Sequence, residues 1–373
     1  MGFLKRWGKR PASQRAGKRF GKAGRRFSNR LLSGLLPLPR NHSVGEIADV
    51  RTVLLVRPNL RIGNTILSTP FIPALRAMFP GARLLVLGSE TSGVVLENLP
   101  IDGVHVLSRS FVLRPWRLTG LLRRLRAERI DVAVEAGMGS FSGSMFALLS
   151  GARYRVGCEG SASRFLNVRV PRPRVAHVRD RIPEFVRALG GECSDELVWR
   201  VSAQESDAAG RLLADPARAD QQLARGFLAI FVGGHLDKRV PDDQWVAIVE
   251  ELDRAGARFV VLAGPEEHAL RDRLAARPSL GRHVLPPQPL RIVAAVMARA
   301  DLVLTTDSGP MHLSSALGRP TIALLERERS RRFVPRGAED RVLMSPGVEE
   351  VVAGVREHPR WGAVAPVGGV DQP

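Results

Sequence analysis

The chain has 373 residues and a formal net charge of +19, and 44% of its residues are hydrophobic. This length predicts two or three domains with ordinary buried cores. The two cysteines exclude a disulfide framework, no Cys/His cluster has zinc-site spacing, and no run of about 18 apolar residues predicts a transmembrane helix. A reducing compartment is the simplest interpretation.

The excess of positive charge is concentrated in residues 1–40. This arm carries 12 of the 56 basic residues and no acidic residue, and it lacks the long apolar core of a secretory signal. Its aromatic residues alternate with the cations, as in segments that attach to anionic membranes. A disordered charge run, a nucleic-acid-binding segment and an organelle transit peptide are the alternatives. We predict that residues 1–50 form a basic arm that is either disordered or bound to an anionic membrane surface, and we do not expect nucleic acid as its partner.

After the arm, short apolar strands alternate with helical segments. Strands are expected at 53–56, 84–88, 104–107 and 131–134. Their apolar runs are continuous, which is typical of strands that are buried on both faces. The repeated order of strand and helix predicts a parallel sheet with right-handed crossovers. The sequence therefore predicts a Rossmann-like domain over residues 51–215.

The pattern restarts after a polar, alanine-rich stretch at 204–225. Further strands are expected at 227–232, 259–262, 302–305 and 321–325. They predict a second Rossmann-like domain over 216–345, followed by a C-terminal helix and tail over 346–373. In open parallel sheets ligands bind beyond the carboxyl ends of the strands, so the loops that follow strands are the candidate sites. We expect an α/β protein in which the two domains face each other across a cleft.

The loop at residues 306–312 joins a buried strand to a helix. Ser308 suits the N-cap of that helix and Pro310 its first turn. Gly309 lets a ligand approach the backbone closely. This composition predicts a helix N-terminus built for ligand binding, with a well-capped turn that binds nothing as the alternative.

Three residues of this loop are suited to a phosphorylated sugar. The amides of Met311 and His312 are expected to be free at the positive end of the helix, where a phosphate group binds. The His312 side chain can donate to a phosphate oxygen, and Asp307 can accept hydrogen bonds from sugar hydroxyls. We predict that the loop binds a phosphate-bearing ligand.

Two further loops of the second domain carry candidate residues. Lys238 follows a strand that ends in two glycines, and it can reach a phosphate as a point charge. Gly264 and Glu267 lie where another strand gives way to a helix, and they can hold a base or a ribose. A surface Lys-Arg pair and a plain turn with an acidic first helical residue are the respective alternatives.

One loop of the first domain is also a candidate. Arg61, Gly63 and Asn64 follow the first strand, on the opposite side of the expected cleft. Gly63 permits a tight turn, and Asn64 can either bind a ligand or cap the next helix. We predict that this loop belongs to the acceptor side of the site.

Four blocks of the sequence together resemble the heptosyltransferase family, glycosyltransferase family 9. They lie at 61–76, 238–241, 264–267 and 300–320, and the resemblance covers residues 52 to about 345. Its most specific part is Thr306-Asp307-Ser308-Gly309-Pro310-Met311-His312. The resemblance implies the GT-B fold and transfer of a heptose from an ADP-sugar to a growing lipopolysaccharide core. It also implies action at the cytoplasmic side of the inner membrane, inversion at the anomeric carbon, and no metal or other cofactor.

The resemblance implies roles for individual residues as well. The implied donor-binding residues are Gly264, Glu267, Asp307, Ser308, Gly309, Met311 and His312. Among them Asp307 would face the donor sugar and Glu267 the nucleoside. Lys238 would be the basic partner of the diphosphate, whose growing negative charge it would stabilise together with His312.

The chain departs from the family where a catalytic base is expected. The family commonly has Gly-Asp where this chain has Gly63 and Asn64, and an amide cannot take a proton from a hydroxyl at neutral pH. Val240 replaces a commoner tryptophan. Glu135, at the end of a predicted strand, is the nearest alternative carboxylate, although a structural role such as pairing with an arginine is equally open.

The departure at Asn64 leaves two other classes of protein open. One is a catalytically inactive nucleotide-sugar-binding protein of the same fold. The other is a different GT-B enzyme, such as a sugar-nucleotide epimerase, which acts on the donor alone. We favour the transferase, with a nucleotide-sugar donor, a lipid-linked glycan acceptor and a membrane surface held by residues 1–40 as its partners.

Overall fold

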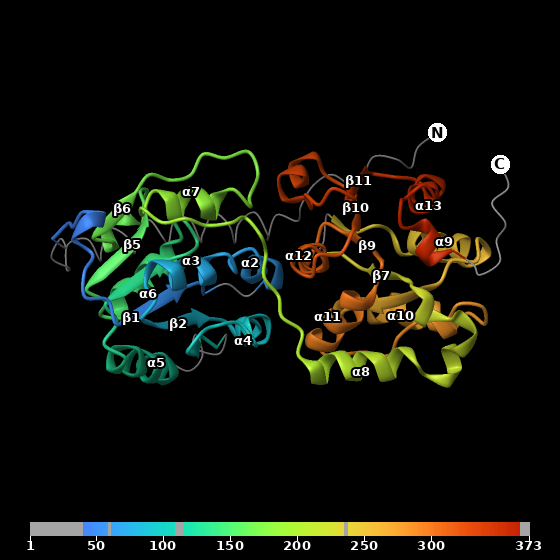
Figure 1. The fold of residues 1–373 in the computed structure, drawn as a ribbon, viewed down its shortest axis with the longest axis horizontal. Coiled ribbons are helices and arrows are strands. Elements are labelled where there is room, and N and C mark those ends of the chain that lie inside the picture. Colours follow the sequence, from blue (N-terminus) through green and yellow to red (C-terminus); the bar gives the residue numbers. More distant parts are fainter. Residues whose placement is uncertain (1–39, 59–60, 109–114, 235–237, 366–373) are drawn as a thin grey trace. The chain divides into compact units, whose positions relative to one another are not determined.

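The computed structural model describes residues 40–58, 61–108, 115–234 and 238–365. The predictions for residues 1–39 of the basic arm and for residues 235–237 lie outside these ranges. The sequence predicts that the arm reaches residue 50, but Val44, Ile47 and Val50 pack against the core of the first sheet, so that part of the prediction is wrong. Within them the chain forms two parallel β-sheets with helices on both faces, which confirms the predicted α/β class (Figure 1).

The first sheet has six strands in the order β3-β2-β1-β4-β5-β6. Its strands are β1 (Thr52–Val56), β2 (Arg83–Gly88), β3 (Gly103–Val106), β4 (Val132–Glu135), β5 (Tyr154–Cys158) and β6 (Val168–Val170). Its helices are α2 (Ile62–Ile66), α3 (Phe71–Met78), α4 (Glu90–Leu96), α5 (Pro115–Ala127), α6 (Phe141–Leu149) and α7 (Arg181–Arg187). The chain builds outward from β1 to β3 and then returns to place β4 beside β1. The direction of winding therefore reverses between β1 and β4.

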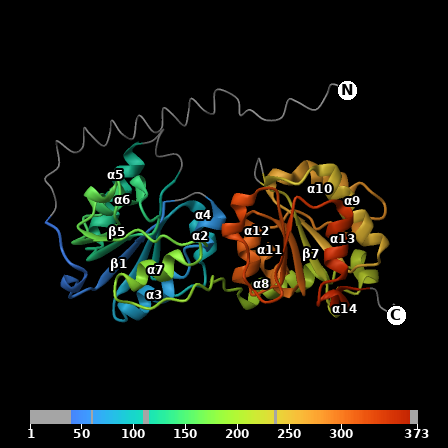
Figure 2. The ribbon, with the colours of Figure 1, turned by 90° about the horizontal axis from the view of Figure 1, so that it is seen from above.

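Alternate residues of β1 point to opposite faces of this sheet. Val53 and Leu55 pack in one apolar cluster with side chains of α3 and α7, whereas Leu54 and Val56 pack in another with side chains of α5 and α6. Figure 2 shows α3 and α7 on one side of the sheet and α5 and α6 on the other. Burial on both faces explains why the strands read as continuous apolar runs.

The second sheet has five strands in the order β11-β10-β9-β7-β8. Its strands are β7 (Leu228–Val232), β8 (Phe259–Ala263), β9 (Leu302–Thr306), β10 (Thr321–Leu325) and β11 (Arg341–Met344). The helices are α8 (Ala203–Leu213), α9 (Asp242–Arg254), α10 (His268–Ala275), α11 (Leu290–Arg299), α12 (Gly309–Ala316), α13 (Val348–Arg356) and α14 (Trp361–Val364). Helices α9, α10 and α13 pack on one face and α8 and α11 on the other. Here the winding reverses between β7 and β9.

The segment that joins the two sheets differs from its prediction. The polar stretch at 204–225 begins with α8, which packs against α11 of the second sheet. Residues from about 203 onward therefore belong with the second sheet, whereas the sequence placed the boundary at 215. The C-terminal helices α13 and α14 also join this core, through Val351, Val355 and Val364.

None of the helices within the described ranges combines the length and the apolar composition that crossing a membrane requires.

Candidate functional site

The predicted site residues gather at the two places where the winding of the sheets reverses. Gly63 and Asn64 follow β1, and Glu135 ends its neighbour β4. Lys238 follows β7, and Asp307 follows its neighbour β9. At such a reversal the two loops diverge to opposite faces and leave a crevice at the carboxyl ends of the strands, which is where open α/β sheets bind ligands.

An ion pair joins the two loops of the second sheet. The Lys238 ammonium Nζ lies 2.6 Å from Oδ2 of Asp307, and the Asp307 side chain is only 3% exposed. The Thr306 hydroxyl donates to the carbonyl oxygen of Gly233, so the loop after β9 is also tied to the loop after β7. A buried carboxylate thus holds the lysine head group at the edge of the crevice.

Glu267 lies beside this pair at the neighbouring strand end. It closes the turn Pro265–Glu267 after β8, and its carboxylate is mostly buried. Burial raises the pKa of Glu267, as does the nearby Glu266, while hydrogen bonds from the backbone of Gly234 and Gly264 lower it. Gly233 has φ +139°, and a Cβ there would lie 2.5 Å from the Glu267 carboxyl carbon. The glycine is therefore required for the carboxylate to reach the strand end.

The start of α12 is confirmed in part. Ser308 is its N-cap and Pro310 lies in its first turn, as predicted. The Met311 amide, however, donates to the Ser308 carbonyl oxygen at 3.2 Å. Its side chain is buried with Ala323 and Leu325. The expectation that this amide is free for a phosphate is therefore wrong, and Met311 anchors the loop to the core.

His312 is a neutral imidazole at physiological pH. Its side chain is mostly buried, and burial lowers its pKa to about 4, because the Asp307 carboxylate that favours the charged form is outweighed by desolvation and by the nearby Lys238. The ring also meets Phe333 edge-on, with the ring centroids 6.4 Å apart. A neutral imidazole donates one hydrogen bond and accepts one, so His312 can donate to an anion without carrying charge.

This shift predicts a pH dependence of stability. The folded pKa is about 4 and the unfolded value 6.5, so as the pH falls below 6.5 the unfolded chain takes up the proton first. The free energy of unfolding should therefore drop between pH 6.5 and 4. We expect the change between pH 7.5 and 5 to be smaller in His312→Gln by about 2 kcal/mol. Urea denaturation at both pH values measures this, and an equal change in both proteins would contradict it.

The loop after β1 contacts the start of α12 through Gly63. A Cβ on Gly63 would lie 2.9 Å from Cδ2 of His312 and 3.5 Å from Cα of Gly309. Asn64 is the third residue of α2, whose N-cap is the exposed Arg61. The alternative that Asn64 caps its helix is therefore wrong. Its half-buried side chain starts from the segment that lies against His312.

We expect Gly63→Ala to separate α2 from α12. The added methyl group meets a buried ring that has little room to move, so the crevice between them should widen. Sugar transfer, the activity that the family resemblance implies, should fall at least about tenfold, while a nucleotide diphosphate should still bind. Gly93→Ala in α4 is the matched control, because a Cβ there meets nothing within 4 Å. Equal transfer rates for the two variants would show that the close approach at Gly63 is unimportant.

Glu135 is enclosed by the loop that follows it. Its oxygens accept hydrogen bonds from the amides of Gly137 at 2.6 Å, Gly139 at 2.7 Å and Ser140 at 3.3 Å. Burial raises the pKa of this carboxyl, an effect that the three amides and Arg57 oppose. A fully buried carboxylate with both oxygens occupied organises a loop. The geometry thus favours the structural alternative for Glu135 over the role of catalytic base.

Four arginines lie around this loop. Burial lowers the pKa of Arg181, and the neighbouring Arg332 and Arg172 lower it further. Burial also lowers the pKa of Arg57. The Glu135 carboxylate raises this pKa, and the neighbouring Arg181 lowers it further. The Nε atoms of Arg57 and Arg332 are buried and have no hydrogen-bond partner within the described part of the chain. Clustered and partly desolvated cations of this kind are stabilised by an anionic ligand.

The segment at Phe333 and Val334, which lies against Lys238, was not identified from the sequence. The Lys238 Nζ lies 5.6 Å from the centre of the Phe333 ring, at the end of the turn Glu328–Phe333. Nε2 of His177 lies 3.0 Å from the Val334 carbonyl oxygen, to which it donates because its Nδ1 accepts the Arg179 amide. The only sequence signal is an apolar pair, Phe333-Val334, in an otherwise charged stretch.

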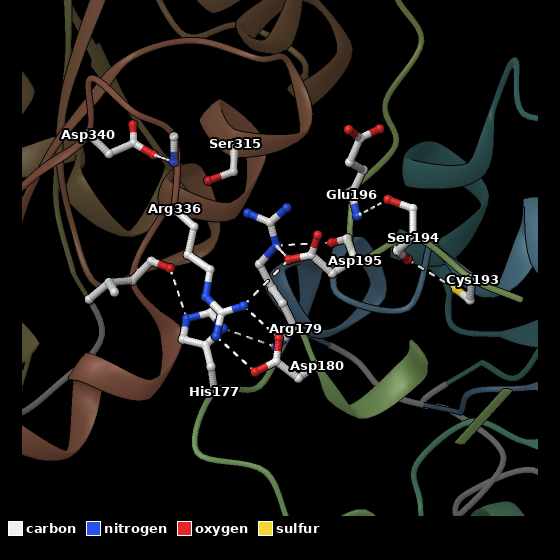
Figure 3. Close-up of polar contacts among 12 residues, drawn as sticks. His177, Arg179, Asp180, Cys193, Ser194, Asp195, Glu196, Ser315, Arg336 and Asp340 are labelled. Atoms are coloured by element: carbon white, nitrogen blue, oxygen red, sulfur yellow. Dashed lines mark hydrogen bonds and ion pairs between the residues drawn. The ribbon is translucent and has the colours of Figure 1, made fainter. Parts of the chain in front are cut away.

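A bidentate ion pair fastens the same segment. Arg336 meets the two carboxylate oxygens of Asp180 at 2.5 and 2.9 Å. Figure 3 shows these two side chains pointing toward each other beside His177. The loop before α7 and the segment after Phe333 are therefore held together by charge-assisted hydrogen bonds.

A family model for glycosyltransferase family 9 (heptosyltransferase) matches residues 118–355. The chain belongs to this family. The match includes Lys238, Asp307 and His312 but begins after Asn64, so the position at which the chain departs from the expected Gly-Asp lies outside it.

Curated proteins that are similar in sequence to this family 9 chain are heptosyltransferases as well. Lipopolysaccharide heptosyltransferase 1 of Escherichia coli O18:K1:H7 (strain RS218 / NMEC) is 30% identical over 113 residues, which are 30% of this chain and 35% of the relative. The chain thus spans about a third of the length of the curated relatives it matches.

Solved structures of the family share the fold over most of the chain. The glycosyl transferase family 9 protein from Veillonella parvula DSM 2008 superposes with a TM-score of 0.67 at 20% identity, covering 86% of this chain and 93% of that one. The E. coli ADP-heptose lps heptosyltransferase II gives a TM-score of 0.64 at 19% identity, covering 81% and 97%. The predicted GT-B fold is confirmed.

Proposed function

We propose that this family 9 chain transfers a heptose from an ADP-linked donor to an acidic glycan of the lipopolysaccharide core, with inversion at the anomeric carbon. The observation that carries the proposal is the pair of Lys238 and buried Asp307 at the start of α12, where the winding of the second sheet reverses. The names of its relatives, which include an ADP-heptose lps heptosyltransferase, support the choice of sugar and nucleotide.

In the proposed reaction the acceptor hydroxyl attacks the anomeric carbon and gives its proton to water, while the bond to the diphosphate breaks and ADP leaves. Negative charge grows on the leaving diphosphate, and Lys238 and the His312 N–H stabilise it as it develops. Asp307 accepts hydrogen bonds from the hydroxyls of the donor sugar, and Glu267 accepts hydrogen bonds from the hydroxyls of the ribose. Asn64 has no basic atom, so its part is to orient the acceptor.

We propose further that the reaction needs no metal ion, since Lys238 and the positive end of α12 supply the charge. Within the described residues no group of three or more His, Cys, Asp or Glu is arranged to hold a metal. Unchanged transfer rates in the presence of a chelator would agree with this proposal, and loss of activity that Mg²⁺ restores would refute it.

The arginines around Glu135 support an anionic acceptor. Arg57, Arg172, Arg181 and Arg332 bring several positive charges to the carboxyl edge of the first sheet, and a neutral glycan would leave this charge unpaired. We also propose that residues 1–40 hold the enzyme at the inner face of the cytoplasmic membrane, where a lipid-linked acceptor is confined.

Transfer of radiolabelled heptose from ADP-heptose to a lipopolysaccharide acceptor truncated before its first heptose tests the function. Thermal unfolding with ADP, UDP and GDP tests the donor site separately, because a bound ligand raises the unfolding temperature. Stabilisation by ADP with label in the acceptor is the expected result. Stabilisation without transfer would favour the binding-only alternative, and conversion of the donor without an acceptor would favour an epimerase.

A further inference from the structure

Helix α5 presents an exposed face that the proposed reaction does not use. In the described part of the chain two large hydrophobic side chains are exposed, Trp116 at 66% and Val106 at 38%. Both lie at the same corner of the first sheet, since Val106 ends the edge strand β3 and Trp116 begins α5. An exposed tryptophan and an exposed valine at one corner of a sheet indicate a surface that binds a partner.

The side chains of α5 divide into two faces. Leu121 and Leu125 are buried against the sheet. At 100° per residue, Trp116 and Arg123 lie in one stripe on the opposite side of the helix. Arg123 and Arg124 lie within about 80° of Trp116 around the helix. All the cations of α5 are exposed, namely Arg117, Arg123, Arg124 and Arg126. No acidic residue occurs between Pro115 and Ala127.

Two of these arginines are not explained by ion pairing. Arg123 and Arg124 form no ion pair with any side chain in the ranges that the structure describes. Four cations on a helix of 13 residues repel one another, which costs stability unless negative charge lies nearby. A helix that carries an exposed tryptophan at its start and exposed arginines along its length is complementary to a surface that is both anionic and apolar.

We propose that the outer face of α5 docks on an anionic lipid bilayer, with Trp116 at the level of the head groups and the arginines on lipid phosphates. Tryptophan favours this interfacial layer because its ring is apolar and its N–H polar. Arginine extends its apolar stem along the surface while its guanidinium pairs with phosphate in bidentate fashion. Basic amphipathic helices lie on anionic membranes in this way.

The position of α5 relates the docking face to the reaction. Helix α5 follows the carboxyl end of β3, so Trp116 lies at the same edge of the sheet as the loops of Gly63 and Glu135. A bilayer bound there would present a lipid-linked acceptor to that edge. This step rests on the proposed function, whereas the docking itself rests on α5 alone.

Co-sedimentation of the full chain with vesicles tests the docking. The vesicles contain either phosphatidylglycerol with phosphatidylcholine or phosphatidylcholine alone. Arg123→Glu with Arg124→Glu should weaken partition onto the anionic vesicles at least about tenfold. The control is Arg211→Glu with Arg356→Glu, which changes the net charge equally at exposed positions of α8 and α13. The control should retain binding within about twofold, and equal losses in the two double variants would overturn the proposal.

A second measurement distinguishes membrane contact by α5 from membrane contact by the basic arm, which is present in every variant. Brominated phosphatidylglycerol quenches tryptophans that reach the acyl boundary. Quenching of the wild type should exceed that of Trp116→Phe, and equal quenching would overturn the proposal. Tighter binding to RNA or DNA than to anionic vesicles, lost in Arg123→Glu with Arg124→Glu, would assign the face to nucleic acid instead. None of these readouts requires sugar transfer, so failure of the proposed function leaves them interpretable.

Discussion

Lys238→Gln should lower kcat for sugar transfer by about two to three orders of magnitude, the usual effect of removing one preorganised group from a developing negative charge. The Lys238 ammonium lies 2.6 Å from a buried carboxylate, which holds it in place. Glutamine keeps a donor of similar length that can still bond to Asp307, but it removes the charge. The loss should therefore appear mainly in kcat, with a smaller change in the affinity for ADP.

Steady-state transfer measured with saturating donor tests this expectation. The matched control is Arg254→Gln, which removes a cation from an exposed ion pair with Glu251 at the end of α9 and should leave kcat unchanged. If Lys238→Gln retained more than about a third of the wild-type kcat, the lysine would not be acting on the leaving group.

A double-mutant cycle with Asp307→Asn separates the two partners. If Lys238 acts on the diphosphate only from its position beside Asp307, the effects of the two substitutions should not add, and the double variant should be little slower than the slower single variant. Additive losses would mean instead that Asp307 acts on the sugar independently of the lysine.

The strands that position the site could be predicted from the sequence because their signal is local. β1, β4, β7 and β9 are apolar runs that end in glycine, proline or polar residues, and each lies within about two residues of its predicted place. The sequence does not predict β5 and β6, since each is interrupted by an arginine, Arg155 and Arg169. The sequence shows helix α8 only as a polar, alanine-rich stretch, because of its 11 residues only Ala209 is buried.

The sequence indicated the residue types of the site but not how its loops are arranged. The residue types at Lys238 and Asp307 indicate an anion site, and the fold brings them together. His177 and Val334 are in contact although they lie 157 positions apart in the chain, and no local sequence pattern predicts such a contact. The Met311 amide differs from expectation because it donates within its own turn, to the Ser308 carbonyl oxygen. For Glu135 the sequence left a structural role open, and the amides of the loop that follows it favour that role.

Arg291→Met should lower the free energy of unfolding by about 3–5 kcal/mol, the usual effect of breaking a buried ion pair from one side. Arg291 is 7% exposed, and its guanidinium forms a bidentate pair with Glu205 at 2.6 and 2.8 Å. It also donates to the carbonyl oxygens of Arg200, Val94 and Glu97, and it lies over the Trp199 ring. Methionine fills the space but leaves the carboxylate and these carbonyl oxygens without their donor.

The control for this variant is Arg299→Met on the same helix. Arg299 is exposed and, among the residues that the structure describes, donates only to Ser206, at 3.1 and 3.2 Å, so we expect a loss below about 1 kcal/mol. Because Arg291 connects α4 of the first sheet with α8 and α11 of the second, its loss should also uncouple the two sheets. Urea unfolding of Arg291→Met should then broaden or divide into two transitions, whereas Arg299→Met should keep the wild-type profile. A single transition at the wild-type midpoint would show that the apolar cluster through Trp199 couples the sheets without the arginine.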